Sequence, residues 1–152
     1  MSFKYPLASD QLLEQIRRRI AGATWANLIT MGPEGYPRAR AMEDHNVGED
    51  FIFFFETDAS TRKLAEIAAN PKVSISYYCP DERDYICIFG NAEIVMDNDL
   101  KAARWREGWE NYWPAGPTDP GYVVVRITAK ALEYFDMEAK QLRKVSIPRL
   151  GA

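Results

Sequence analysis

Short apolar runs of strand character follow one another along this chain, and most are separated only by tight turns. Parallel strands need a crossover connection of about a dozen residues or more, usually a helix, whereas antiparallel strands can follow a turn directly. The pattern therefore excludes a doubly wound parallel sheet. It predicts a mainly β fold, an antiparallel split β-barrel of six or seven strands with three short flanking helices, and closure of such a barrel would remove exposed sheet edges.

The predicted strands begin with a hairpin, because residues 25–30 and 36–44 are extended runs on either side of the turn sequence Gly32-Pro33-Glu34-Gly35. The aromatic run 51–55 predicts a buried third strand. Later strands are expected at residues 72–78, 85–96, 122–128 and 131–136. Gly90 indicates a bend or bulge within one of them. The segment from Met137 onward has no clear pattern and receives no assignment.

Three segments have helical periodicity. The first follows Ser9-Asp10, and its apolar stripe is Leu12, Leu13, Ile16 and Ile20. The second spans residues 60–70 and is stopped by Pro71. The third is capped by Asp97, carries Leu100, Trp105, Trp109 and Tyr112, and ends in a proline-rich loop at 114–121. The basic run Arg17-Arg18-Arg19 is interpreted as a solvated face and is assigned no function.

Composition limits the class of protein further. A chain of 152 residues with 47% hydrophobic side chains predicts one soluble domain spanning residues 1–152, with no membrane span. The net charge of −3 gives no positive field for nucleic acid. The first six residues lack the apolar core of a signal peptide, and Cys79 and Cys87 predict free thiols in a reducing cytoplasm. Their spacing and the single histidine argue against a metal site.

Hydroxyl and basic side chains gather where a predicted strand ends and a helix begins, in the run Thr57-Asp58-Ala59-Ser60-Thr61-Arg62-Lys63. Free amide N–H groups and the positive end of the helix dipole meet at such a junction, and Arg62 and Lys63 add full charges that suit phosphate oxygens. The simpler alternative is that a Ser or Thr here only caps the helix.

A second basic pair lies in the predicted hairpin, where strand alternation places Arg38 and Arg40 on one face. Two neighbouring cations repel each other, so they suit either an exposed surface or a bound dianion such as a phosphomonoester. Neither the basic pair nor the strand–helix junction is specific by itself.

Together these segments resemble the pyridoxamine 5'-phosphate oxidase-related FMN-binding split barrels. The resemblance rests on Arg38-Ala39-Arg40, Phe53-Phe54-Phe55-Glu56-Thr57, Thr61-Arg62-Lys63 and Asn70-Pro71-Lys72-Val73. The run 113–122 followed by Leu132-Glu133-Tyr134-Phe135-Asp136 is similar to the general stress protein 26 branch. The similarity extends from about Leu12 to Asp136.

The resemblance implies FMN as cofactor and a homodimer with the flavin at the subunit interface. It implies that Arg40, Thr61, Arg62 and Lys63, with Arg38 beside them, hold the FMN phosphate, and that Thr57 and the Met42 backbone line the flavin. An aromatic side chain of the partner, Trp109 or Trp113, is the candidate for closing the flavin slot. The alternative for these tryptophans is plain core packing.

Departures from the family pattern limit the expected activity. His45 stands where the oxidase has a lysine five residues after the phosphate-binding arginine, and the C-terminal Arg-x-His of the oxidase is missing. Pyridoxamine phosphate oxidation is therefore not expected. Phe135 replaces the tryptophan usual in the general stress protein branch. His45 is either an acid or base beside the flavin or an ordinary surface residue.

The expected function is a flavin-dependent oxidoreductase that acts on a small molecule or a nicotinamide donor. The adjacent acidic pairs Glu43-Asp44 and Asp81-Glu82 point to opposite faces of an extended chain and form no acid/base dyad. No Ser or Cys lies in a nucleophile motif, so hydrolysis has no support. The alternative is a non-catalytic flavin-binding or sensor protein, or a dimeric barrel without cofactor.

Overall fold

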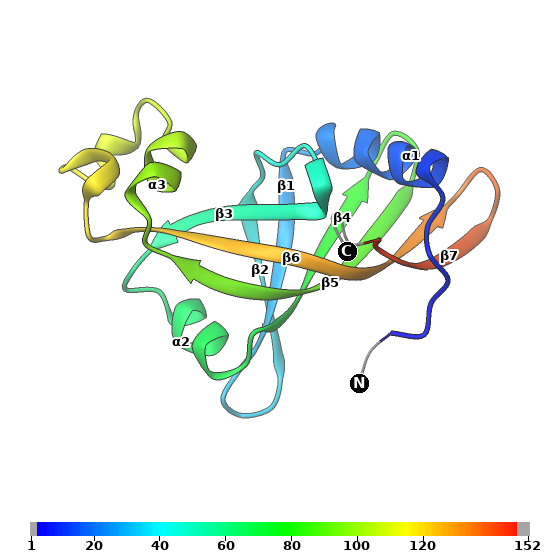
Figure 1. Ribbon diagram of the computed structural model, residues 1–152, viewed down its shortest axis with the longest axis horizontal. Helices are drawn as coiled ribbons and strands as arrows, with labels where there is room; N and C mark the ends of the chain where they lie inside the picture. The colour runs from blue at the N-terminus through cyan, green and yellow to red at the C-terminus, as the bar shows by residue number, and fades with distance from the viewer. Residues whose placement is uncertain (1–2, 149–152) are drawn as a thin grey trace.

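The computed structural model describes residues 3–148, and its centre is one antiparallel sheet of seven strands (Figure 1). Along the hydrogen-bonded path the strands follow the order β2-β1-β4-β5-β6-β3, and β7 pairs with β6 outside this path. The strands are β1 (Trp25–Met31), β2 (Pro37–Glu43), β3 (Ile52–Asp58), β4 (Lys72–Cys79), β5 (Asp84–Val95), β6 (Tyr122–Asp136) and β7 (Gln141–Ser146). The predicted mainly β fold is confirmed.

The sheet curls without closing into a complete ring. β2 and β3 are the two ends of the strand order, and no ladder joins them among residues 3–148. The expectation that closure removes the sheet edges is therefore wrong. Instead, the side chain of Asn46 serves the free edge of β3, because its amide nitrogen donates to the Phe54 carbonyl at 3.0 Å and its oxygen accepts from the Phe54 amide at 2.8 Å. Strands β2 and β3 therefore remain two separate edges of the sheet.

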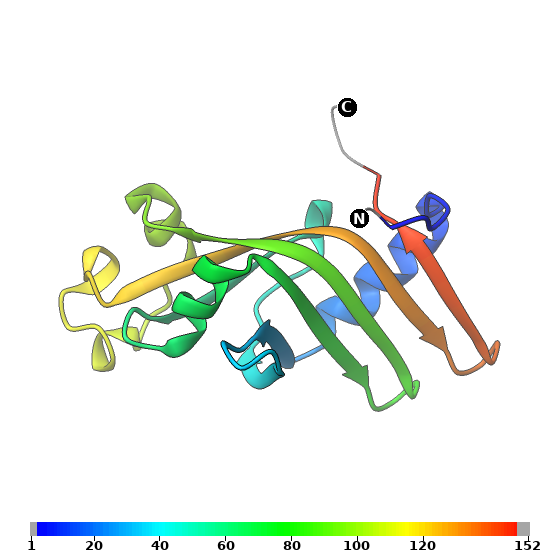
Figure 2. The same ribbon diagram turned by 90° about the horizontal axis from the view of Figure 1, so that it is seen from below.

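The main core lies on the inner face of the curled sheet. Strand alternation directs Leu28, Ile75, Ile88 and Ile127 inward, where each is fully buried. Helix α1 (Asp10–Ala21) covers this core with its predicted apolar stripe, and Ser9 caps the helix by accepting from the Leu12 amide at 3.2 Å. Figure 2 shows how the long β5 and β6 strands bend, so that their two halves face different elements.

Gly90 lies in the middle of β5. The β5–β6 register shifts between Phe89 and Gly90, which confirms the predicted irregularity. A Cβ atom at Gly90 would lie 2.6 Å from the Thr128 carbonyl oxygen, so only glycine allows the strands to approach this closely. Opposite the shift, residues 122–136 form the single strand β6 rather than the two strands expected.

Two more sequence expectations need correction. Helix α3 (Asn98–Arg104) begins after the predicted Asp97 cap but stops before Trp105, whose backbone is extended. Trp109 belongs to a separate short 3-10 helix. Gly108 directly before it takes the left-handed conformation with φ of 95°, so no continuous α-helix can run through this point. The unassigned C-terminal segment contains β7, which forms a hairpin with β6.

Candidate functional site

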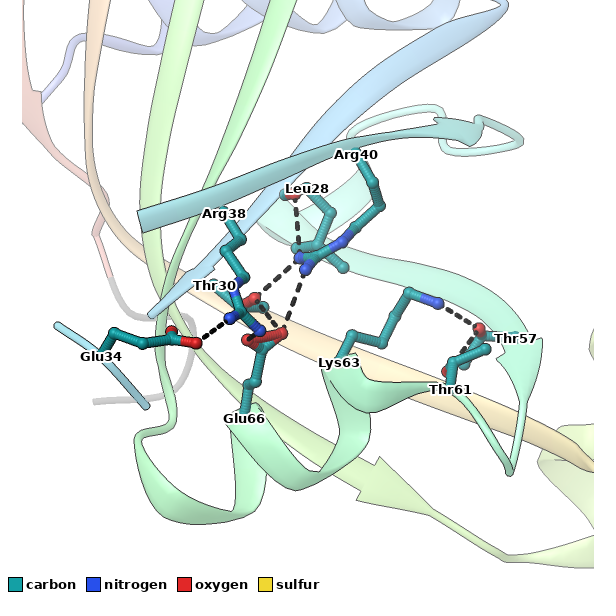
Figure 3. A network of polar contacts seen from close by, with 9 residues as sticks. All are labelled: Leu28, Thr30, Glu34, Arg38, Arg40, Thr57, Thr61, Lys63 and Glu66. Carbon is teal, nitrogen blue, oxygen red and sulfur yellow. Dashed lines mark hydrogen bonds and ion pairs between the residues drawn. The ribbon is translucent and has the colours of Figure 1, made fainter. Parts of the chain in front are cut away.

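The candidate site lies at the split, where helix α2 (Arg62–Ala69) spans the space between edge strands β2 and β3 (Figure 3). The helix starts directly after β3 because Asp58 organises the turn. Its side chain accepts from the Ser60 amide at 2.9 Å, and its carbonyl accepts from the Thr61 hydroxyl at 2.8 Å. This tight connection places the first turn of α2 opposite the arginine-bearing face of β2.

Glu66 holds the two arginines of β2. Its carboxylate accepts from Arg38 at 3.0 Å and from Arg40 at 3.2 Å, and also from the Thr30 hydroxyl at 3.2 Å. Glu66 is only 5% exposed, so these contacts fix both guanidinium groups. Arg38 additionally pairs with Glu34. The prediction that Arg38 and Arg40 share one face is confirmed.

Sequence reasoning overlooked Glu66 and Thr30. Glu66 follows Lys63 by three residues, and this spacing places both on one helix face. That spacing was the signal in the sequence that could have assigned Glu66 to the site. Thr30 is the cross-strand partner of Arg38 in the β1–β2 hairpin. Its hydroxyl accepts from Arg40 at 2.7 Å and donates to Glu66, so it links the strand pair to the helix.

Lys63 is the buried cation of the site, and the part of the chain that the structure describes places no carboxylate within ion-pair distance of it. Its ammonium group donates to the Thr57 hydroxyl at 2.7 Å, and among residues 3–148 it forms no ion pair. The side chain is buried, with 8% exposure. Burial lowers the pKa of Lys63, and the nearby Arg40 charge lowers it further. A buried cation held by a neutral hydroxyl favours an anion in the adjacent space.

The other predicted cofactor residues lie around this pair. Thr61 precedes the helix, and its hydroxyl is 3.4 Å from that of Thr57. Arg62 is exposed at the first position of α2. Met42 follows Arg40 on the same face of β2 and packs against the main core. The structure therefore brings the phosphate-binding candidates and the flavin-lining candidates to one region.

Trp109 and Trp113 lie beyond the far end of β3, in a cluster with Trp105, Tyr122 and Val124. Trp113 is 9% exposed, and its indole nitrogen donates to the Asp58 carboxylate at 3.0 Å. Both rings line a cavity of about 340 Å³ together with Thr57 of the same subunit. Trp109 and Trp113 therefore pack in a hydrophobic cluster, as the core alternative expects, and also form part of the wall of a cavity.

His45 lines the same cavity, with its side chain 18% exposed and its ring 6.2 Å from that of Trp109. Its Nε2 atom is buried without a hydrogen-bond partner among the described residues. His45 is therefore largely enclosed and is not an ordinary surface residue.

The charge balance defines what the split can bind. The four cations Arg38, Arg40, Arg62 and Lys63 outnumber the three carboxylates near them, which are Glu34, Asp58 and Glu66. Burial lowers the pKa of Arg40, and the Glu66 carboxylate offsets this only in part. The surplus of positive charge and the hydroxyl groups of Thr57 and Thr61 suit a dianionic phosphomonoester.

Fold and site together define an antiparallel split barrel with a cluster of basic side chains at its split. The chain belongs to the family described as pyridoxamine 5'-phosphate oxidase like, whose family model matches residues 11–147. The resemblance inferred from the sequence is thereby confirmed. No curated protein matches the chain.

Solved structures share this fold. A protein from Clostridium acetobutylicum related to general stress protein 26 of B. subtilis is 23% identical with a TM-score of 0.77, over 91% of this chain and 96% of that chain. General stress protein 26 from Bacillus anthracis is 27% identical with a TM-score of 0.73, over 89% and 99% of the two chains. A pyridoxamine 5'-phosphate oxidase-related FMN binding protein from Nostoc punctiforme is 16% identical with a TM-score of 0.68, over 91% and 94%.

The same fold occurs in proteins named for other cofactors. An F420 reductase is 24% identical with a TM-score of 0.58, over 76% of this chain and 94% of that chain. A heme binding protein from Mycobacterium smegmatis is 16% identical with a TM-score of 0.71, over 92% and 60%. The fold alone therefore does not define the cofactor.

Proposed function

We propose that this protein is an FMN-binding flavoprotein that acts as an oxidoreductase on a small molecule. The observation that supports FMN most directly is the buried Lys63 ammonium, which faces Arg40 and has only the Thr57 hydroxyl as partner. A bound phosphate would supply the missing negative charge. FMN ends in such a phosphate, and a pocket built for it discriminates against riboflavin, which has none.

In this proposal, Arg40, Thr61, Arg62 and Lys63 hold the FMN phosphate, and Arg38 supports Arg40 through their shared contact with Glu66. Thr57 and the Met42 backbone line the flavin ring. When bound, the flavin would supply hydride transfer, which explains why the proposal requires no nucleophilic side chain. The protein contributes placement, charge and exclusion of water.

A homodimer is part of the proposal. Tyr78, Tyr85, Phe135 and Leu142 are register partners across β4, β5, β6 and β7, and they form an apolar row on the outer face of the sheet. Tyr78, Tyr85 and Leu142 are 62%, 43% and 40% exposed, which leaves this row accessible to a partner. We assign a second copy of this chain to this face. Light scattering of the wild type and of Tyr85→Asp tests it, with a dimer expected only for the wild type.

We assign Trp109 and Trp113 to the wall of the flavin region. Both rings line the cavity that contains Thr57 of their own subunit, which favours a contribution within one chain. A contribution across the dimer to the partner's flavin is the alternative stated by the family resemblance. Flavin fluorescence in a mixed dimer of wild type and Trp109→Phe separates these arrangements.

The second candidate is a flavin carrier or sensor without turnover. His45, the single histidine of the chain, lies in the cavity wall and is the candidate acid or base if the protein has turnover. If the protein is an oxidoreductase, FMN-loaded protein oxidises reduced nicotinamide under air. Tight FMN binding without such turnover favours the carrier.

The experiment for FMN itself is retention of cofactor by the purified protein. The wild type is expected to keep FMN through desalting and to show flavin absorbance. The double variant Arg40→Glu/Lys63→Glu is expected to lose it with an unchanged circular dichroism spectrum, because like charges then face the phosphate. Arg143→Glu/Lys144→Glu, exposed on β7, is the matched control. Preferential retention of heme or F420 by the wild type would contradict FMN as the cofactor.

A further inference from the structure

The cavity beyond Thr57 has a character opposite to that of the arginine site. It is lined by three carboxylates and three aromatic rings, and we call it the acidic aromatic pocket. Its acidic members are Glu43, Glu56 and Asp58. Its rings are those of Trp109, Tyr112 and Trp113. Thr57 belongs to both sites, because its hydroxyl accepts from Lys63 and the residue also lines this pocket.

One of the three carboxylates is neutralised within the protein. Arg104 donates to Glu56 at 2.6 Å, and the Glu56 side chain is only 5% exposed. The guanidinium of Arg104 in turn lies 5.0 Å from the centre of the Phe54 ring. This pair therefore contributes little net charge to the pocket.

Asp58 keeps its negative charge. Its carboxylate accepts from the Ser60 hydroxyl at 2.6 Å, the Ser60 amide at 2.9 Å and the Trp113 indole at 3.0 Å. These hydrogen bonds, those from Ser60 above all, lower the pKa of Asp58. These three donors are neutral and stabilise the anion without cancelling its charge, and the nearby Lys63 charge lowers the pKa of Asp58 further.

Glu43 adds a second charge at the mouth of the pocket, where its side chain is 56% exposed. His45 Nε2 lies 3.4 Å from Glu43 Oε1, without hydrogen-bond geometry, and this buried nitrogen has no other partner among residues 3–148. Negative charge at the pocket therefore comes from Glu43 and Asp58, whereas that of Glu56 is offset by Arg104.

The aromatic side of the pocket suits a cation. The ring centres of Trp109 and Trp113 lie 5.8 Å apart, with an angle of 78° between the ring planes. The ring centre of Tyr112 lies 6.0 Å from that of Trp113. Aromatic faces attract organic cations, most strongly when the cation is partly removed from water. Carboxylates behind such rings add long-range attraction and repel anions.

We propose that the acidic aromatic pocket binds a compact organic cation, a quaternary or protonated amine, through its aromatic rings and the carboxylates of Glu43 and Asp58. That this cation is the substrate class of the flavin rests on the proposed function. Binding of the cation itself does not depend on flavin.

The test uses choline and 3,3-dimethylbutan-1-ol, which have the same shape and differ in the positive charge. Each is titrated into the full-length protein while tryptophan fluorescence and indole N–H resonances are followed. Choline is expected to bind at least about fivefold more tightly than the neutral alcohol. Equal affinities, or no binding of choline at millimolar concentrations, would overturn the proposal.

Variants locate the binding. Glu43→Gln and Tyr112→Ala, both at exposed positions of the pocket, are expected to weaken choline binding severalfold. Glu93→Gln and Tyr36→Ala are controls with matched exposure elsewhere on the surface, and they are expected to bind choline as the wild type does. Equal choline binding by all four variants would place the cation outside the pocket and contradict the proposal.

The same titrations are run with and without FMN, so that the two proposals fail separately. Because Trp109 and Trp113 border both proposed sites, the cation pocket is judged on the flavin-free protein. Retention of FMN by the wild type, with no choline binding to the flavin-free protein, contradicts only the cation pocket. Choline binding by a protein that does not retain FMN contradicts only the flavin function.

Discussion

Lys63 Nζ donates a 2.7 Å hydrogen bond to Thr57 Oγ1, and this contact ties the first turn of α2 to the end of edge strand β3. Both side chains are buried, at 8% and 6% exposure. Figure 3 shows the ammonium at the Thr57 hydroxyl, and within residues 3–148 Lys63 forms no ion pair. Such a placement costs stability in the ligand-free protein and is offset when an anion binds.

Thr57→Val tests this contact. The substitution keeps the volume of the side chain but leaves the buried ammonium without its hydrogen-bond acceptor. We expect a loss of about 1–3 kcal/mol in the free energy of unfolding, measured by urea denaturation without ligand. FMN is expected to stabilise the variant as it does the wild type, because the phosphate supplies new acceptors. An unchanged unfolding free energy would show that the contact has no energetic role.

The lowered pKa of Lys63 predicts how FMN affinity depends on pH. Bound phosphate holds the ammonium charged, so affinity is expected to fall as pH rises through the pKa of the free site, which lies below that of an ordinary lysine. Affinity also falls below about pH 6, where the phosphate gains a proton. Lys63→Arg, which stays charged, is expected to lose the alkaline decline in fluorescence titrations. The same alkaline decline in wild type and variant would exclude Lys63 as its source.

Asp84 is expected to control stability in acid. It is buried and accepts from Tyr134, from the Met137 amide and from Arg19 at 2.8 Å. Burial alone would raise the pKa of Asp84, but these hydrogen bonds outweigh burial and lower it. Its stabilisation is therefore present above the unfolded pKa of about 4 and is lost as pH falls through the lower folded pKa.

Asp84→Asn is expected to lower the free energy of unfolding by about 3 kcal/mol at neutral pH. The difference from wild type should shrink as the pH falls below about 4, where the carboxyl of the unfolded wild type begins to gain a proton, and further as the pH falls through the lower folded pKa. Asp81→Asn, exposed in the same turn, is the control. Urea denaturation at both pH values measures the effect, and a difference that does not vary with pH would contradict the assigned ionisation.

Gly90→Ala tests the bend in β5. The added methyl group would lie 2.6 Å from the Thr128 carbonyl oxygen, so the β5–β6 pair must move apart. We expect a loss of about 1–3 kcal/mol or more in unfolding free energy. Gly22→Ala is the control, because its nearest atoms are 3.7 Å away and its φ of −83° suits alanine. Equal stability of both variants would contradict a requirement for glycine at the bend.

The hairpin of β1 and β2 could be predicted because Gly32-Pro33-Glu34-Gly35 is a turn sequence between two alternating runs. The β6–β7 hairpin could not. Its turn has no glycine or Asn-Gly signal, and Lys140 itself takes a positive φ of 51°. The predicted third helix extends too far because Trp105 and Trp109 continue its apolar spacing, although the backbone already leaves the helix at Trp105.

The candidate site was only partly predictable, because local patterns do not contain the order of the strands in the sheet. Alternation places Arg38 and Arg40 on one face, and a strand end followed by a helix start places Thr57 near Lys63. Their approach across the split depends on the strand order, in which β2 and β3 are opposite ends of the sheet. Neither composition nor spacing contains that order. The role of Glu66 follows only once α2 is known to lie against β2.

The central claim is that the split recognises the phosphate of a flavin nucleotide, and the most direct measurement compares FMN with riboflavin. Dissociation constants of both are obtained from quenching of flavin fluorescence by the wild type and by Lys63→Met, with Lys144→Met as the control. The account predicts that the wild type and the control prefer FMN by at least about tenfold and that Lys63→Met loses most of that preference. Equal affinity of the wild type for FMN and riboflavin would contradict it.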